Sequence, residues 1–221
     1  MNSKLFLTTL ASGVAASALL AAAPASATVV FAFFAGPAHS PTGGFGVIDT
    51  FDTTVGLTGS GFQIKAPPSD ADGAPPANSS PSGTNYLSVL AGGSATYTFG
   101  ADIHAFEFDW GSVDSYNTLT INSSGGNPIV IPGLSFPNAA DGNQTAPGTN
   151  GLFLVFGNAG ETFNSVTFSS SQNSFEVDNL ATPVGTTTFG LPEPTTWGMM
   201  IMGFGMAGAA MRARRRMAAT A

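Results

Sequence analysis

Between residues 28 and 182, apolar residues occur in short runs or alternate with polar ones, and turn-forming residues separate these segments. Side chains alternate between the two faces of a strand, whereas one face of a helix repeats every three to four residues. The pattern therefore predicts about nine short strands rather than helices. We expect them at residues 29–34, 61–65, 94–99, 105–110, 118–122, 128–131, 152–156, 165–169 and 174–180.

Composition supports an all-β fold. Charged residues make up only 9% of the chain, while Gly, Ser, Thr, Asn and Pro are abundant, which suits loop-rich β architectures. We expect one antiparallel β-sandwich or jelly-roll-like domain over residues 28–182, followed by a polar linker over residues 183–190. The chain has no Cys, so a disulfide framework and a thiolate site are excluded.

The charges are distributed unevenly. The sequence has 13 acidic and 6 basic residues, and four of the basic ones lie between residues 212 and 216. Between residues 28 and 190, Lys65 is the only Lys or Arg against twelve Asp and Glu, a balance of 1 − 12 = −11. Binding to a nucleic-acid backbone requires clustered cations, so we expect no nucleic-acid partner.

The first 27 residues have the three parts of a cleavable signal peptide. Lys4 precedes an apolar stretch from residue 5 to about residue 20, and the small residues Ala25 and Ala27 fit the cleavage site of a signal peptidase. Pro24 and the preceding alanines shorten the apolar core, which disfavours the alternative of a transmembrane anchor. We therefore expect export through the secretion translocon, cleavage after Ala27 and a mature chain that begins at Thr28.

The C-terminal residues 191–216 have the pattern of a membrane segment. Residues 195–211 form an uncharged, mostly apolar stretch of about 17 residues, the lower limit for a transmembrane helix. The basic residues 212–216 follow it and should stay in the cytoplasm, with residues 217–221 as a short tail. This topology places the acidic domain outside the inner membrane, in agreement with the signal peptide.

This segment resembles the PEP-CTERM sorting domain, in its proteobacterial variant with Trp after the Pro-Glu-Pro tripeptide. Gly198 and Ala213 depart from the usual pattern without changing its order. The matching residues are Pro192, Glu193, Pro194, Trp197, Gly203, Gly205, Arg212, Arg214, Arg215 and Arg216. The resemblance implies processing by exosortase, transient anchoring in the inner membrane, and delivery to the cell surface or to the extracellular matrix of a biofilm.

A second resemblance concerns the predicted domain. Residues 106–121 and 171–181 resemble segments of β-rich exosortase-dependent surface proteins, which implies a sandwich in a surface setting. The same C-terminal motif also occurs on proteins labelled ice-binding. Ice binding requires a flat and regular Thr or Ala face, and the consecutive Thr186, Thr187 and Thr188 cannot form one.

We expect no enzyme activity. The sequence lacks a Gly-x-Ser-x-Gly elbow and a His-Glu-x-x-His pair. Glu107 and Asp109 share one strand face and would be the acids of a glycosidase. However, Phe106, Phe108 and Trp110 alternate with them, so we expect the aromatic side chains in the core and the two acids on a solvated face.

Oxygen-rich side chains make calcium a candidate ligand, because an extracellular site can be weak and still be filled. The candidate ligands are Asp109, Asp114, Asn117 and Asp178, each of which would otherwise serve in a turn or cap. No other cofactor is required.

The predicted function is that of a structural or adhesive surface component, with exopolysaccharide as a candidate partner. The alternative is a carbohydrate-binding module, with or without calcium, in which Tyr86, Tyr97 or Tyr116 would stack on sugars if exposed. A glycan-active enzyme is less favoured.

Overall fold

The computed structural model describes residues 29–36, 40–76, 84–124, 126–136, 140–146, 148–158 and 160–185. Within these ranges the chain forms ten strands and one short 3₁₀ helix, so the described part is all-β. The elements are β1 (Val29–Ala35), β2 (Phe45–Asp49), β3 (Leu57–Lys65), β4 (Tyr86–Ile103), β5 (Ala105–Gly111), β6 (Asn117–Ser123), β7 (Ile129–Pro132), η1 (Gly133–Ser135), β8 (Gly151–Gly157), β9 (Phe163–Ser170) and β10 (Phe175–Pro183).

Each of the nine expected strands is present, and two strand segments were not predicted. β2 lies in a Gly-rich stretch, and β4 begins at Tyr86, eight residues before the predicted start at Ser94. The Gly92–Gly93 pair has the composition of a loop, because glycine favours turns over strand interiors. In the structure, β4 continues through this pair.

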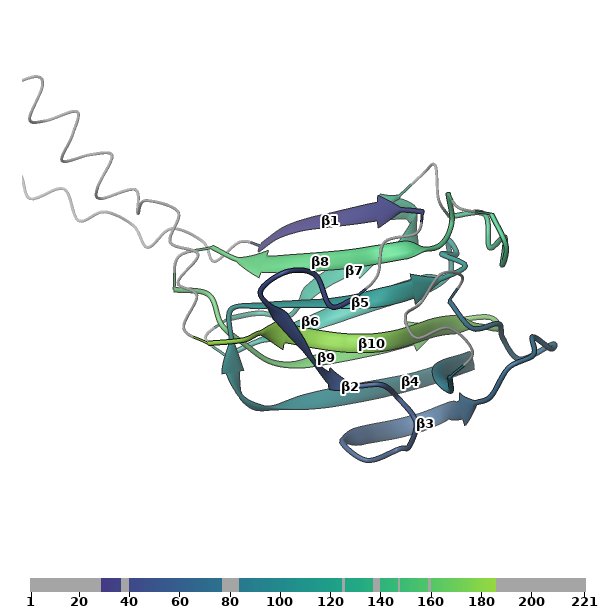
Figure 1. Ribbon diagram of the computed structural model, residues 1–221, viewed down its shortest axis with the longest axis horizontal. Helices are drawn as coiled ribbons and strands as arrows, with labels where there is room; N and C mark the ends of the chain where they lie inside the picture. The colour runs from purple at the N-terminus through teal and green to yellow at the C-terminus, as the bar shows by residue number, and fades with distance from the viewer. Residues whose placement is uncertain are drawn as a thin grey trace, which may run out of the picture.

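The strands form one antiparallel sheet in the order β1-β8-β5-β10-β4-β9-β6-β7, with β2 added to β10 and β3 added to β4. β4 is 18 residues long and belongs to both layers of the sheet, one that contains β10 and one that contains β9. Residues 87–89 pair with β10, and residues 93–98 pair with β9. The sheet therefore curls over itself, and Figure 1 shows β9 and β6 behind β10 and β5.

Glycines allow β3 and β4 to bend where the sheet curls. The register between the two strands shifts between Ser60 and Phe62. A Cβ atom on Gly93 would lie 2.1 Å from the carbonyl oxygen of Gly61, and one on Gly59 would lie 2.2 Å from that of Ser94. Side chains are therefore excluded from this contact between two backbones.

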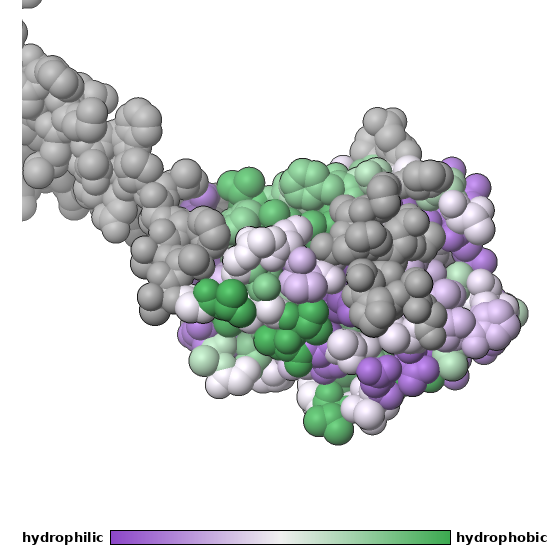
Figure 2. All heavy atoms as spheres, viewed as in Figure 1, coloured by the Kyte–Doolittle hydropathy of each residue, from purple (hydrophilic) through white to green (hydrophobic). Residues whose placement is uncertain are grey.

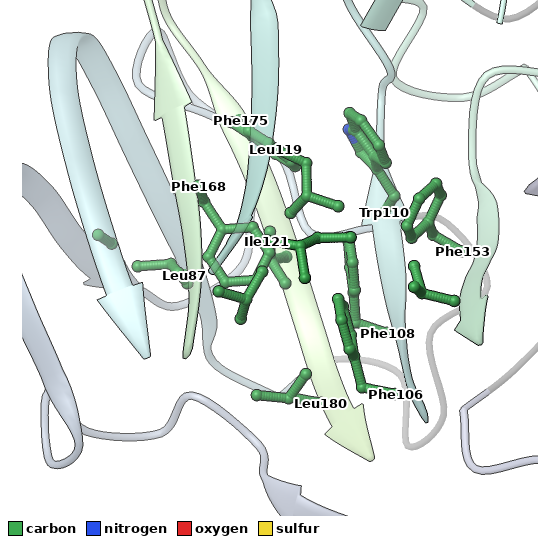
Figure 3. Packing of buried hydrophobic residues seen from close by; sticks show 14 of the residues in the cluster. Leu87, Phe106, Phe108, Trp110, Leu119, Ile121, Phe153, Phe168, Phe175 and Leu180 are labelled. Atoms are coloured by element: carbon green, nitrogen blue, oxygen red, sulfur yellow. The ribbon is translucent and has the colours of Figure 1, made fainter. Parts of the chain in front are cut away.

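The core between the two layers is rich in aromatic side chains. Phe106, Phe108 and Trp110 lie on one face of β5 and are fully buried, which confirms the core position predicted for Trp110. Phe108 packs edge-on against Phe168 of β9 with ring centroids 5.2 Å apart, and Trp110 stacks on Phe175 of β10 at 4.5 Å. Figure 3 shows these rings meeting between the strands.

The start of β1 and the end of β10 lie at the same end of the sandwich. Val29 of β1 lies opposite Gly157 of β8, and Ala181 of β10 lies opposite Glu107 near the start of β5. β1 therefore begins, and β10 ends, at the left of Figure 1. We call the opposite end, with the last residue of β5, the first of β6 and the last of β9, the distal end.

Several predicted segments lie outside the described residues. These are the signal peptide at residues 1–27, linker residues 186–190 (including the Thr run at 186–188), the sorting segment at 191–216 and the tail at 217–221. Among the described residues, no helix is long and apolar enough to cross a bilayer.

Candidate functional site

A layer of acidic side chains lies on the face of β5 and β10 that points away from the aromatic core. Glu107 and Asp109 come from β5, and Glu176 and Asp178 come from β10. All four are at most 2% exposed. The expectation that Glu107 and Asp109 are solvated was therefore wrong, because segments distant in the sequence cover this face.

The first covering segment, residues 40–44, is attached to the two acids of β5. Glu107 accepts hydrogen bonds from the backbone N–H of Thr42 at 2.5 Å and from its hydroxyl at 2.7 Å. Asp109 Oδ1 accepts one from the Ser40 N–H at 3.0 Å. Burial raises the pKa of Glu107, and the bonds from Thr42 and Ser40 oppose that rise. Glu107 and Asp109 therefore hold residues 40–44 against the sheet through hydrogen bonds.

The second covering segment, residues 70–76, contacts Glu176. Glu176 Oε2 accepts a hydrogen bond from the Ser112 hydroxyl at 2.7 Å, and its Oε1 accepts bonds from the Ser174 hydroxyl at 2.5 Å and the Ala74 N–H at 3.3 Å. No hydrogen bond from a cationic group to this carboxylate is found among the described residues. Burial raises the pKa of Glu176 to about 7, although the three hydrogen bonds oppose the shift.

The four predicted calcium ligands fall into two groups. Asp109 and Asp178 are cross-strand neighbours, so their side chains share one face. Asp114 lies instead in the turn after β5 and Asn117 is the first residue of β6, and the Asp114 N–H donates to Asn117 Oδ1 at 2.9 Å. The Asn117 amide also donates to Ser170 Oγ and to the Ser174 carbonyl oxygen. Asn117 therefore stabilises the distal turn.

A bulge adds Asn179 to the Asp109–Asp178 pair. The β10–β5 register shifts after Asp178, and Asn179 has a φ of 51°, which Asn tolerates better than most residues. Its amide N–H donates to Asp109 Oδ2 at 2.9 Å. Its Oδ1 is buried and has no hydrogen-bond partner. Among the described residues, no group of three or more His, Cys, Asp and Glu side chains forms a candidate metal site.

The three tyrosines have different environments. Tyr86 is fully buried, and Tyr97 packs against Phe51 and Phe99. Tyr116 lines an open groove, of about 460 Å³, at the distal end. We call it the Tyr116 groove, and its lining residues are Gly92, Gly93, Ser115, Tyr116, Thr118, Ser169, Ser170 and Ser171. Tyr116 was predictable as a stacking candidate, whereas the serines around it were not.

Exposed apolar side chains lie in separate groups on the face seen in Figure 2. The exposed large apolar side chains among the described residues include Val30 and Phe34 of β1, Val47 and Ile48 of β2, and Val55 in the turn before β3. Polar residues separate these groups in this view. The described residues of this face therefore do not form one continuous apolar surface.

The described residues are all-β, and residues 191–216 follow them in the sequence. Residues 191–216 match the family model of the PEP-CTERM protein-sorting motif, so this chain carries a PEP-CTERM signal. The motif implies an exported protein that is anchored in the membrane, processed by exosortase and sorted to the cell surface. The resemblance found in the sequence is confirmed.

A carbohydrate-binding module (CBM6cm-2) from Cellvibrio mixtus lichenase 5A, solved in complex with cellotriose, matches with 14% identity and a TM-score of 0.35. The match covers 63% of this chain and 98% of that one. A TM-score this low supports no conclusion about function. No curated protein sequence matches the chain.

Proposed function

We propose that this protein is a non-catalytic structural or adhesive component of the cell surface or extracellular matrix. The secretion translocon and signal peptidase deliver it, the inner membrane holds it briefly, and exosortase processes its C-terminal signal. The PEP-CTERM match at residues 191–216 is the observation that carries this proposal. In the matrix, exopolysaccharide is its proposed partner.

The arrangement of the sandwich supports display. The last described strand leads toward the sorting signal from the end of the sandwich that also holds the start of β1. We therefore expect the distal end to face away from the membrane while the C-terminal segment is anchored. A surface protein in this orientation presents its distal turns to the surroundings.

The contacts of the acidic layer support a non-catalytic role. Glu107 and Glu176 accept hydrogen bonds that hold the two covering segments, and both side chains are at most 1% exposed. A glycosidase acid must reach the scissile bond of its substrate. These two acids instead hold loops in place.

The sorting proposal predicts a difference in mature mass between two strains. In cells with exosortase, the protein should lose its C-terminal segment, and in cells without exosortase it should keep this segment and remain in the membrane fraction. Replacing the tripeptide (Pro192→Ala, Glu193→Ala, Pro194→Ala) should reproduce the exosortase-deficient result, whereas Thr187→Ala in the linker should not. Intact mass spectrometry of the protein from both strains tests this prediction, and identical masses would contradict the sorting proposal.

A second candidate function is carbohydrate binding, which the Tyr116 groove favours. Calcium dependence is part of this candidate. Asn179 Oδ1 is a buried acceptor without a donor beside Asp109, whose cross-strand neighbour is Asp178. A half-turn of the Asn179 amide would direct Oδ1 toward Asp109 Oδ2, and hard cations such as calcium prefer such oxygen ligands.

Calcium should stabilise the folded protein by roughly 1 to 3 kcal/mol at ten to a hundred times its Kd. Thermal melts in calcium and in EGTA measure this effect. Asp178→Asn should reduce the calcium-dependent rise in melting temperature, while Asp102→Asn, a matched change at an exposed acid, should leave it intact. An unchanged wild-type melting temperature would remove calcium from the proposal.

A further inference from the structure

Three elements that are distant in the sequence form the Tyr116 groove. Ser115 and Tyr116 come from the turn between β5 and β6, residues 169–171 from the end of β9, and Gly92 and Gly93 from the bend of β4. The lining contains only Gly, Ser, Thr and Tyr. The groove therefore offers hydroxyl groups and one aromatic ring without a charged side chain.

Hydrogen bonds hold the base of the groove. Asn117 Nδ2 donates to Ser170 Oγ at 3.1 Å, and Ser170 Oγ donates to the Gln172 carbonyl oxygen at 2.6 Å. The Tyr116 hydroxyl donates to the Asn173 carbonyl oxygen at 2.8 Å, which fixes the outer end of the ring. The ring position is therefore set before any ligand arrives, which lowers the entropic cost of binding.

The hydroxyls at the edge of the groove remain available. Ser115 and Ser171 are exposed, and the hydroxyls of Ser115, Ser171 and Thr118 have no hydrogen-bond partner within the described structure. Each hydroxyl can both donate and accept. Gly92 adds space, because a Cβ atom at this position would have no neighbouring atom within 4 Å.

We propose that the Tyr116 groove binds a segment of a neutral polysaccharide. Sugars present hydroxyls that both donate and accept, together with an apolar C–H face that packs on an aromatic ring. The groove contains both matching features, whereas an anionic polymer would find no cation in its lining. The inference rests on the proposed adhesive role and deepens it, since the groove lies at the distal end.

Affinity electrophoresis of the full chain tests this inference. The chain is kept soluble in a polyoxyethylene detergent, because sugar-based detergents would compete. Native gels contain dextran, hydroxyethyl cellulose, galactomannan, or the neutral polysaccharide fraction of the producing cells' own matrix, with anionic alginate as the charged comparison. We expect at least one neutral polymer to retard the wild-type protein.

Two variants test the location of the site. Ser171→Trp fills the groove from an exposed position and should weaken binding about tenfold or more, as expected when stacking and hydrogen bonds are blocked together. Thr54→Trp adds the same ring in the turn before β3, away from the groove, and should bind like wild type. Both variants should melt at the wild-type temperature, which separates blocking from misfolding.

Three results would overturn the inference. These are no retardation by any neutral polymer, retardation by alginate alone, and equal binding by Ser171→Trp and wild type. Because binding is measured on purified full chain, it is independent of exosortase. Normal sorting without binding therefore counts against the groove alone, and binding without sorting counts against the delivery route alone.

Discussion

Glu176 is a buried acid whose proton equilibrium should affect stability near neutral pH. Its side chain is 1% exposed, and its described hydrogen-bond donors are the Ser112 and Ser174 hydroxyls and the Ala74 N–H. Burial raises its pKa from 4.5 to about 7. In the unfolded chain the group is solvated and has its ordinary pKa. Between these two values the folded state therefore binds more protons than the unfolded state.

Stability should consequently fall as the pH rises from about 4.5 to about 7, by up to about 3 kcal/mol from this group. Glu176→Gln has no proton to lose and should show a flatter profile. Urea unfolding of both proteins at pH 5 and pH 8 measures this effect. The difference between the two proteins isolates Glu176 from other acids with raised pKa, such as Glu107. Equal changes in the two proteins would contradict the assignment.

Alternation along β5 predicted which residues share a face but not what covers each face. It placed Trp110 in the core correctly and assigned Glu107 and Asp109 to solvent wrongly. The donors that cover these acids, on Ser40 and Thr42, lie 65 to 69 residues away in the sequence. A local sequence pattern cannot predict a contact between residues that lie so far apart in the chain.

At the scale of the element, β4 joins the two layers because its first part pairs with β10 and its later part pairs with β9. Strand positions were predictable from apolar runs, but the continuity of β4 was not. The Gly92–Gly93 pair that suggests a break is the place where the strand turns from β10 to β9. Strand propensity is a property of single residues, whereas pairing with β3 and β9 keeps this segment of β4 extended.

Gly93→Ala should therefore destabilise the protein by about 2 kcal/mol, because the added methyl group would lie 2.1 Å from a backbone oxygen. Gly100→Ala is the matched control, since a Cβ atom at this position of the same strand meets nothing within 4 Å. It should change the free energy of unfolding by less than about 0.5 kcal/mol. Urea denaturation compares the two, and equal effects would exclude the close contact as the cause.

At the scale of the whole molecule, the all-β class followed from composition and periodicity. The sorting signal followed from its motif, and family comparison confirmed it. The Tyr116 groove could not be predicted, because its walls come from β4, β9 and the turn before β6, and the sequence does not state the register that brings these elements together. Their proximity is a property of the curled sheet.

The orientation of the sandwich can be measured directly, because the chain has no Cys and a single introduced one can be labelled. In proteoliposomes of the full chain, a fluorophore at Val184→Cys should transfer energy to acceptor lipids more efficiently than one at Ser115→Cys. Val184 is about ten residues from the predicted membrane helix, a span of at most about 35 Å. Equal transfer from the two sites would contradict an outward-facing distal end.

Lys65 is the only Lys or Arg between residues 28 and 190, and its ammonium group is paired with Asp70. Proteases of the trypsin type cut after Lys and Arg, and they require a locally unfolded chain. The domain therefore offers them a single bond, at the end of a paired strand. For an exported protein that is sorted to the cell surface, this composition favours a long working life.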